Sequence, residues 1–167
     1  LAAGLAMAPA TVAADPPVSA EGLVRWTRAV EAYQGGVPEP LVKEFSAEAA
    51  LQSPIGDHVR SLLADALARR GDLAAARRLA LSVADRHRDS RLAPRALLTA
   101  TRLASESGDE AAAQTTLVRL LDAYPDAPEL PQALYLLGMS AEARGQLETA
   151  ALAYRELTIL APATGWA

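Results

Sequence analysis

Gly71-Asp72-Leu73-Ala74-Ala75-Ala76 is the stretch that decides the fold, because it returns twice along the chain. It reappears as Gly108-Asp109-Glu110-Ala111-Ala112-Ala113 and, with more substitutions, as Gly145-Gln146-Leu147-Glu148-Thr149-Ala150. The glycines stand at 71, 108 and 145, a constant step of 37 residues. A fixed step of this size indicates a repeat architecture, in which each unit packs mainly against its neighbours.

Each unit is predicted to be a pair of helices. Apolar residues recur every three or four positions on both sides of Gly145: Leu134, Leu137, Ala141, then Leu147, Ala150, Tyr154 and Leu157. This spacing places one apolar stripe on each of two helices. A glycine between them supplies the positive φ that ends the first helix, and Asp72 or Asp109 is expected to cap the second.

These helix pairs cannot bury their stripes alone, so they must stack. The predicted fold is therefore all-α: tandem helix-turn-helix hairpins forming an α-solenoid with a 37-residue period. Helices are expected at 57–69, 73–87, 94–106, 110–123, 131–143 and 147–160. Small residues on paired helices, such as Gly138 and Ala150, should let their backbones approach closely.

The third unit resembles the tetratricopeptide repeat. Its large and apolar positions are Leu134 and Leu137, and its two small positions are Gly138 and Ala150. Its turn, aromatic and proline positions are Gly145, Tyr154 and Pro162. The resemblance implies three repeats at about 57–90, 94–127 and 131–164. The alternative is a set of unrelated amphipathic helices in an alanine-rich chain.

In that family the first helix of each hairpin lines a concave face. The matching positions here are Ser61, Asp65, Arg69, Arg95, Leu98, Arg102, Gln132, Tyr135 and Met139. Arg95 and Arg102 could hydrogen-bond carboxylates, and Tyr135 offers an amphipathic contact, so these three residues are the predicted binding site. The alternative is a solvated helix face.

The amino-acid composition limits the fold class and the classes of binding partner that are expected. Apolar residues make up 51% of the chain and aromatic residues only 4%, which suits packed helices and not a β-sandwich. The net charge is −4, with 16 basic residues scattered among 20 acidic ones, so nucleic acid is not an expected partner. No run approaches the roughly 18 apolar residues that would cross a bilayer. A protein partner is expected.

Residues 1–14 differ from the rest, because they are uncharged and end in small residues. They are predicted to be the remnant of a secretory signal peptide, its basic start missing, which implies export to a bacterial periplasm. If they are instead an apolar helix of the fold, a cytoplasmic location follows. No cysteine is present to carry a lipid anchor. Residues 15–20 are expected to be a flexible N-terminus.

Residues 21–52 are predicted to form a degenerate leading hairpin, with helices at 21–33 and 41–51. Two glycines and two prolines at 35–40 end the first of these helices. The repeats at 53–167 are expected to continue beyond the chain end, because the outer face around Tyr154 and Leu157 would otherwise remain partly uncovered.

Catalytic chemistry is not expected in this chain. There is no cysteine, and His58 and His87 are the two histidines. Gly35-Gly36 lacks the lysine of a phosphate-binding loop. Glu106-Ser107 falls at a helix end facing water, where a carboxyl group lacks the apolar surroundings that raise its pKa for acid catalysis. No catalytic residue, metal site or cofactor is predicted.

Residues 20–167 also resemble the N-terminal helical region of soluble lytic murein transglycosylases. The segments that carry this resemblance are Ser53-Pro54-Ile55-Gly56-Asp57 and Asp89-Ser90-Arg91-Leu92-Ala93-Pro94-Arg95-Ala96. It implies a scaffold for a C-terminal lysozyme-like domain, outside this chain, that cleaves peptidoglycan with a glutamate. The alternative is a stand-alone cell-envelope adaptor of the Tol-Pal type, although no coiled-coil segment precedes the repeats.

Overall fold

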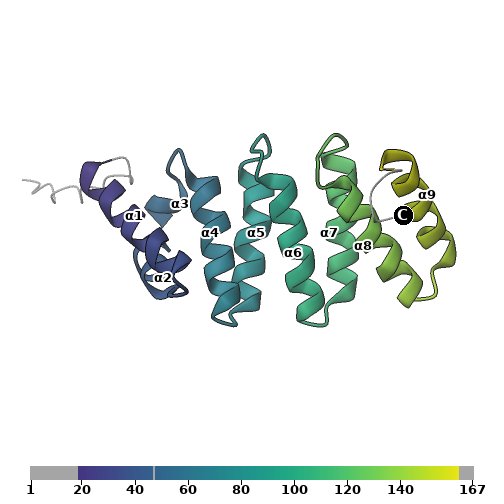
Figure 1. Ribbon diagram of the computed structural model, residues 1–167, viewed down its shortest axis with the longest axis horizontal. Helices are drawn as coiled ribbons and strands as arrows, with labels where there is room; N and C mark the ends of the chain where they lie inside the picture. Colours follow the sequence, from purple (N-terminus) through teal and green to yellow (C-terminus); the bar gives the residue numbers. More distant parts are fainter. Residues whose placement is uncertain (1–18, 47, 162–167) are drawn as a thin grey trace, which may run out of the picture.

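A single row of helices makes up the molecule (Figure 1). The computed structural model describes residues 19–46 and 48–161, and within them it contains helices and connecting turns but no strand. The helices are α1 Ala20–Gln34, α2 Glu39–Phe45, α3 Glu48–Leu51, α4 Gly56–Arg69, α5 Leu73–Arg86, α6 Ala93–Glu106, α7 Glu110–Ala123, α8 Leu130–Ala143 and α9 Leu147–Leu160. The predicted all-α solenoid of helical hairpins is confirmed.

The turns inside the hairpins α4–α5, α6–α7 and α8–α9 repeat one geometry. Gly71, Gly108 and Gly145 have φ values of 86°, 79° and 72°. In the first turn the amide of Asp72 donates to the carbonyl of Leu67 at 2.9 Å, and that of Gly71 donates to Ala68 at 2.9 Å. This is a Schellman motif, which needs a left-handed residue, and glycine adopts that conformation at the lowest steric cost.

The predicted caps are only partly present. Asp109 Oδ1 accepts a hydrogen bond from the amide of Ala112 at 3.1 Å, so it caps α7 as expected. Asp72 makes no such bond, and its carboxylate lies 3.6 Å from Arg70 instead. Ser19 caps α1 by accepting from Gly22 at 3.0 Å. Helix α1 therefore begins inside the stretch 15–20 that was expected to be flexible; residues 1–18 lie outside the described residues.

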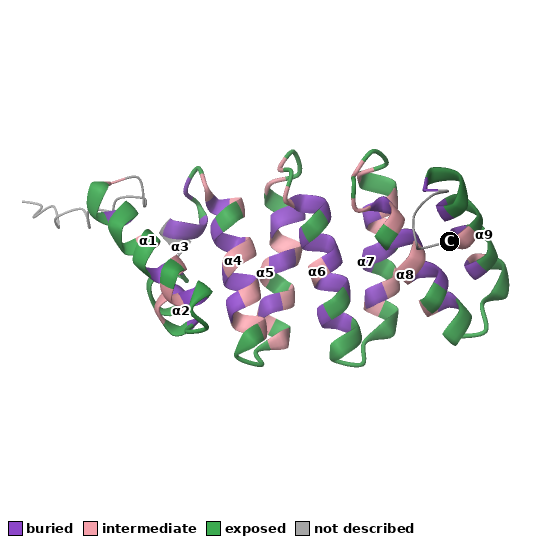
Figure 2. Cartoon of the chain, viewed as in Figure 1, coloured by how far each residue is buried: buried purple, intermediate pink, exposed green. Residues whose placement is uncertain are grey.

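The core runs between the helices and continues from hairpin to hairpin (Figure 2). One cluster joins five helices through the buried side chains Val83, Leu97, Leu117, Leu120, Leu137 and Ala153. A second cluster holds α1, α2, α3 and α4 together, and in it the Trp26 and Phe45 rings meet edge to face at 5.0 Å. Because adjacent units share these clusters, each hairpin depends on its neighbour for burial.

The leading region differs from prediction. The single helix expected at 41–51 is two helices, α2 and α3, and α2 already begins at Glu39 with Pro40 in its first turn. Proline is tolerated there because the first amides of a helix have no intrahelical partner. The hydroxyl of Ser46 donates back to the carbonyl of Val42 at the end of α2. Such side-chain bonds compete with continuation of the helix.

The last hairpin agrees only in part with the prediction of a partly uncovered face. Leu157 is 1% exposed and therefore covered, whereas Tyr154 is only partly buried. The ring of Tyr154 lies directly over Gly138, where an added Cβ would be 2.4 Å from ring atom Cε1. The glycine thus makes room for the aromatic ring. The large apolar residues of α9 that remain exposed are Leu147, Leu152, Ile159 and Leu160.

Candidate functional site

Three adjoining hollows lie along the first helices of the hairpins, α4, α6 and α8. The first hollow, about 280 Å³, is lined by residues that include Ser61, Ala64, Asp65, Ala80, Arg95 and Thr99. The second, about 460 Å³, includes Arg95, Leu98, Thr101, Arg102, Leu117 and Leu136. The third, about 390 Å³, includes Tyr33, Asp65, Arg69, Arg102 and Glu106. We call the three hollows together the groove.

Shared residues make these hollows one continuous surface. Asp65 lines the first and third hollows, Arg102 the second and third, and Arg95 and Thr99 the first and second. The second hollow also repeats the first at the 37-residue step, with Leu98 for Ser61, Arg102 for Asp65 and Leu117 for Ala80. The repeat therefore places two hollows at equivalent positions, and different side chains line them.

The charges of the groove are compensated unequally. Arg102 lies 2.6 Å from Glu106, one helical turn away. The Arg69 guanidinium stacks over the Tyr33 ring at 4.3 Å. Burial and the carboxylate of Asp65 raise the pKa of the Tyr33 hydroxyl, against the opposing effect of Arg69. Within residues 19–46 and 48–161, the exposed side chain of Arg95 has no hydrogen bond or ion pair, so it is a cation available to a ligand.

The predicted binding residues are only partly brought together. Arg95 and Arg102 both line the groove, whereas Tyr135 packs against the cluster of Leu134, Leu157 and Ala161 and does not line the hollows described above. Met139 also lies outside them. Thr99, Leu136 and Ser140 line the groove but were not predicted. Thr99 follows Arg95 by four residues, as Leu136 follows Gln132 and Ser140 follows Leu136, so the helical period alone could have indicated them.

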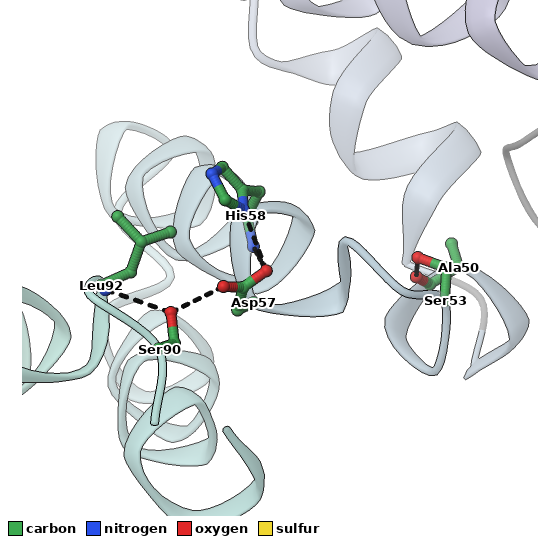
Figure 3. A network of polar contacts seen from close by, with 6 residues as sticks. All are labelled: Ala50, Ser53, Asp57, His58, Ser90 and Leu92. Carbon is green, nitrogen blue, oxygen red and sulfur yellow. Dashed lines mark hydrogen bonds and ion pairs between the residues drawn. The ribbon is translucent and has the colours of Figure 1, made fainter. Parts of the chain in front are cut away.

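A polar network stands at the N-terminal end of α4, next to the first hollow (Figure 3). Asp57 Oδ2 accepts from the hydroxyl of Ser90 at 2.6 Å, and Oδ1 accepts from the His58 amide at 2.8 Å and lies 2.9 Å from His58 Nδ1. Ser90 Oγ in turn accepts from the amide of Leu92 at 3.1 Å. The network ties the start of α4 to the start of α6.

This network is structural and not nucleophilic. The hydroxyl of Ser90 is bonded to the carboxylate and not to the imidazole, whereas activation of a serine requires a base that takes its proton directly. Burial opposes ionisation of Asp57, but the hydrogen bonds from Ser90 and His58 outweigh it and lower the pKa of this carboxyl group to about 2. Asp57 therefore remains ionised and stabilises the fold across the physiological range.

Acid should weaken the fold through Asp57. Its folded pKa, about 2, lies below the ordinary value of 3.8, so its contribution of about 2 kcal/mol is present above pH 3.8 and is lost as the pH falls towards 2. We expect the free energy of unfolding of wild type to exceed that of Asp57→Asn at about pH 5 and the gap to close by about pH 2. Urea denaturation measures both, with the exposed Asp122→Asn as control. A gap that stays constant over this range would contradict the assignment.

Other clusters offer little chemistry. Glu106 is engaged by Arg102 at a helix end, as its position predicted. The ring of His87 packs against Gly56. Among residues 19–46 and 48–161, no three His, Cys, Asp or Glu side chains gather in a group that could hold a metal ion. None of the described helices combines the length and apolar character needed to cross a membrane.

A further cavity, about 920 Å³, lies between the loops that join successive hairpins. Its walls carry charges of both signs, including Arg88 and Arg91 against Asp89 and Asp126, and its third arginine, Arg119, is paired with Asp85 at 2.7 Å. The mixed charge gives it no preference for one class of ligand. The groove, with its uncompensated Arg95, is the better candidate site.

Comparison with known proteins agrees with this architecture. The family model of the tetratricopeptide repeat matches residues 132–164, which contain most of α8 and all of α9. No curated protein matches the chain. The stacked hairpins, the repeated turns and the matched segment define a TPR-like helical module. Repeats of this type generally mediate contacts between proteins, which suggests a role as an interaction scaffold.

Proposed function

We propose that the groove of α4, α6 and α8 binds an extended segment of a partner protein, or of a C-terminal domain of the same protein. The observation that carries the proposal is the 37-residue repetition of one set of groove positions in two adjoining hollows. A periodic surface suits a partner that is itself extended. Side chains held on helices are largely fixed before binding, which lowers the ordering cost of association.

The groove should favour acidic segments. Arg95 has no protein partner among the described residues, and Arg102 lies two turns further along the same helix face. A guanidinium group binds a carboxylate through two parallel hydrogen bonds, which are among the stronger polar contacts in proteins. Tyr135, at the next hairpin, is proposed as an additional contact for a longer segment.

The charge reversal Arg95→Glu should weaken the binding of a peptide to the groove at least tenfold. The loss of one charge-assisted hydrogen bond corresponds to about 1.5–3 kcal/mol, or about ten- to hundredfold in affinity. The probe is a peptide selected on the purified wild-type chain from a random library, and fluorescence polarisation measures its affinity. Arg78→Glu, the same charge change at an exposed position of α5, is the matched control.

Two results would contradict the proposal. Either the library yields no peptide that binds the wild-type chain, or the selected peptides bind Arg95→Glu as tightly as Arg78→Glu. Circular dichroism on both variants checks that the helices are retained, so that loss of binding reports the groove and not unfolding.

For the protein as a whole, we propose an exported periplasmic scaffold that forms the N-terminal part of a soluble lytic transglycosylase acting on peptidoglycan. The support is the pair of sequence segments at 53–57 and 89–96 and the uncharged residues 1–14. The chain itself would supply no catalytic group, since the reaction belongs to a domain beyond residue 167. A Tol-Pal-type adaptor without enzymatic activity is the second candidate, favoured by the general interaction role of such repeats.

One experiment separates these candidates. The reading frame beyond residue 167 is sequenced, and the full-length product is incubated with isolated peptidoglycan. A compact domain with a Glu-Ser pair, together with release of soluble fragments that is lost when its glutamate is changed, is the expected result. A frame that ends after further repeats, with no release, would support the adaptor. Cell fractionation tests the periplasmic location.

A further inference from the structure

The two loops that join successive hairpins share one backbone geometry, although their sequences differ. The loop after α5 opens at His87, with φ −132° and ψ 57°, and the loop after α7 opens at Tyr124, with φ −135° and ψ 62°. In each loop the amide three residues later turns back on the first residue. Ser90 donates to the carbonyl of His87 at 3.0 Å, and Ala127 donates to that of Tyr124 at 3.1 Å. The position in the repeat therefore determines this geometry.

Helix α9 ends in the same way as α5 and α7. Its C-cap, Ala161, has φ −139° and ψ 59°, and the amide of Ala161 donates to the carbonyl four residues earlier at 2.9 Å, as in the other two helices. The next residue is Pro162, which matches Pro125 at the equivalent place. Residues 162–167 lie outside the described residues, but the conformation that leads into them is the one that opens both described loops.

The fifth residue after each of these C-caps stands at the start of the next helix. Leu92 is the N-cap of α6, lines the first hollow together with Ser61 and packs against the cluster that joins α5 to α9. Ile55, the N-cap of α4, packs in a similar way against the cluster of the leading region. Glu129 holds this position before α8 and lines the cavity between the loops. After α9 the position is Trp166, which is again large and apolar.

The 37-residue step also identifies the neighbour of Trp166. Two steps carry Leu92 to Trp166, and the same two steps carry Ser61, which lines the same hollow as Leu92, to Tyr135. Tyr135 is partly buried on α8 and packs against the apolar cluster at the end of α9. One turn further along α8, Met139 is 47% exposed. An aromatic ring therefore lies where the repeat geometry brings the indole.

From this repetition we infer that residues 162–166 form a loop of the same geometry and that the Trp166 indole packs against the Tyr135 ring. Aromatic rings prefer offset or edge-to-face arrangements, with centroids about 4.5–7 Å apart. The pair adds an aromatic wall to the groove at α8, so a partner segment that reaches this end meets Trp166 together with Tyr135. The packing itself does not depend on the binding role proposed for the groove.

Fluorescence of a chain with a single tryptophan tests this contact. The sequence has two tryptophans, and Trp26→Phe leaves Trp166 as the reporter while it keeps an aromatic ring against Phe45. We expect an emission maximum shifted to the blue of free tryptophan and acrylamide quenching reduced several-fold. Nuclear Overhauser cross-peaks between the indole of Trp166 and the ring of Tyr135 should report the same contact directly.

Substitutions in the Trp26→Phe chain separate this contact from other positions of the indole. Tyr135→Ala should return the emission and quenching of Trp166 to those of an exposed indole, whereas Tyr135→Phe keeps the ring and should not. Leu152→Ala, at a 54% exposed position of α9, is the control and should change neither property. Circular dichroism checks that the helices are retained in each variant.

Two results would overturn the inference. One is an exposed Trp166 indole without cross-peaks to Tyr135, and the other is an emission that responds to Leu152→Ala and not to Tyr135→Ala. If Tyr135→Ala unfolds the chain, the cross-peaks measured with Tyr135 in place decide. The groove function is tested separately, by peptide selection and Arg95→Glu, so the two proposals can fail independently.

Discussion

Gly56→Ala should destabilise the protein by about 3 kcal/mol, although alanine is the better helix former. Gly56 is the first residue of α4, and a Cβ placed on it would lie 2.2 Å from the carbonyl oxygen of Leu51. The obstacle is backbone, held by the buried core around Leu51, so it cannot rotate away as a side chain would. Accommodation requires the end of α3 to separate from α4.

Urea denaturation at neutral pH measures this loss directly. The matched control is Ala93→Gly, since Ala93 starts α6 at the equivalent position one repeat later and carries a buried Cβ without conflict. That change should cost only about 1 kcal/mol, the ordinary penalty for glycine in a helix. If Gly56→Ala proves as stable as wild type, the close approach of α3 and α4 is wrong.

Leu120→Ala is the second change with a large expected effect, at about 3 kcal/mol. Leu120 is 0% exposed and lies in the cluster that joins α5, α6, α7, α8 and α9. Its equivalents Val83 and Leu157 are also buried, so the truncation opens a cavity at a position that is buried in all three repeats. Because the cluster spans hairpins, the loss should lower the stability of both neighbours.

Val118→Ala provides the control two residues away on the same helix. Val118 is 44% exposed, so its truncation should change the free energy of unfolding by no more than about 0.5 kcal/mol. Equal effects of Leu120→Ala and Val118→Ala in denaturation experiments would mean that the core does not run through α7 as described.

The sequence predicted the elements that recur. The glycine step, the apolar stripes and the helix bounds of the hairpins from α4 to α9 agree with the structure to within one residue, because each depends on local spacing repeated three times. The resemblance to the tetratricopeptide repeat placed Arg95 and Arg102, seven residues apart, on one face of the first helix of their hairpin, and both line the groove.

Features that depend on a single long-range contact could not be predicted. Arg60 is 4% exposed at the position where later repeats have Leu97 and Leu134, and it donates to Ser82 Oγ at 3.0 Å. The repeat step aligns Arg60 with these leucines, but the local pattern does not indicate that its charged side chain is buried in the same way. The coverage of Leu157 and the packing of Tyr154 on Gly138 likewise follow from how α8 meets α9, which no single helix encodes.

The central claim is that the groove of α4, α6 and α8 is the binding surface. An NMR titration of the isotopically labelled chain with a library-selected peptide tests it most directly, because each backbone amide reports its own surroundings. The predicted result is a set of shift changes concentrated at Ser61, Asp65, Arg95, Thr99 and Arg102. Shift changes concentrated instead on the outer faces of α5 and α7, around Arg78 and Val118, would contradict it.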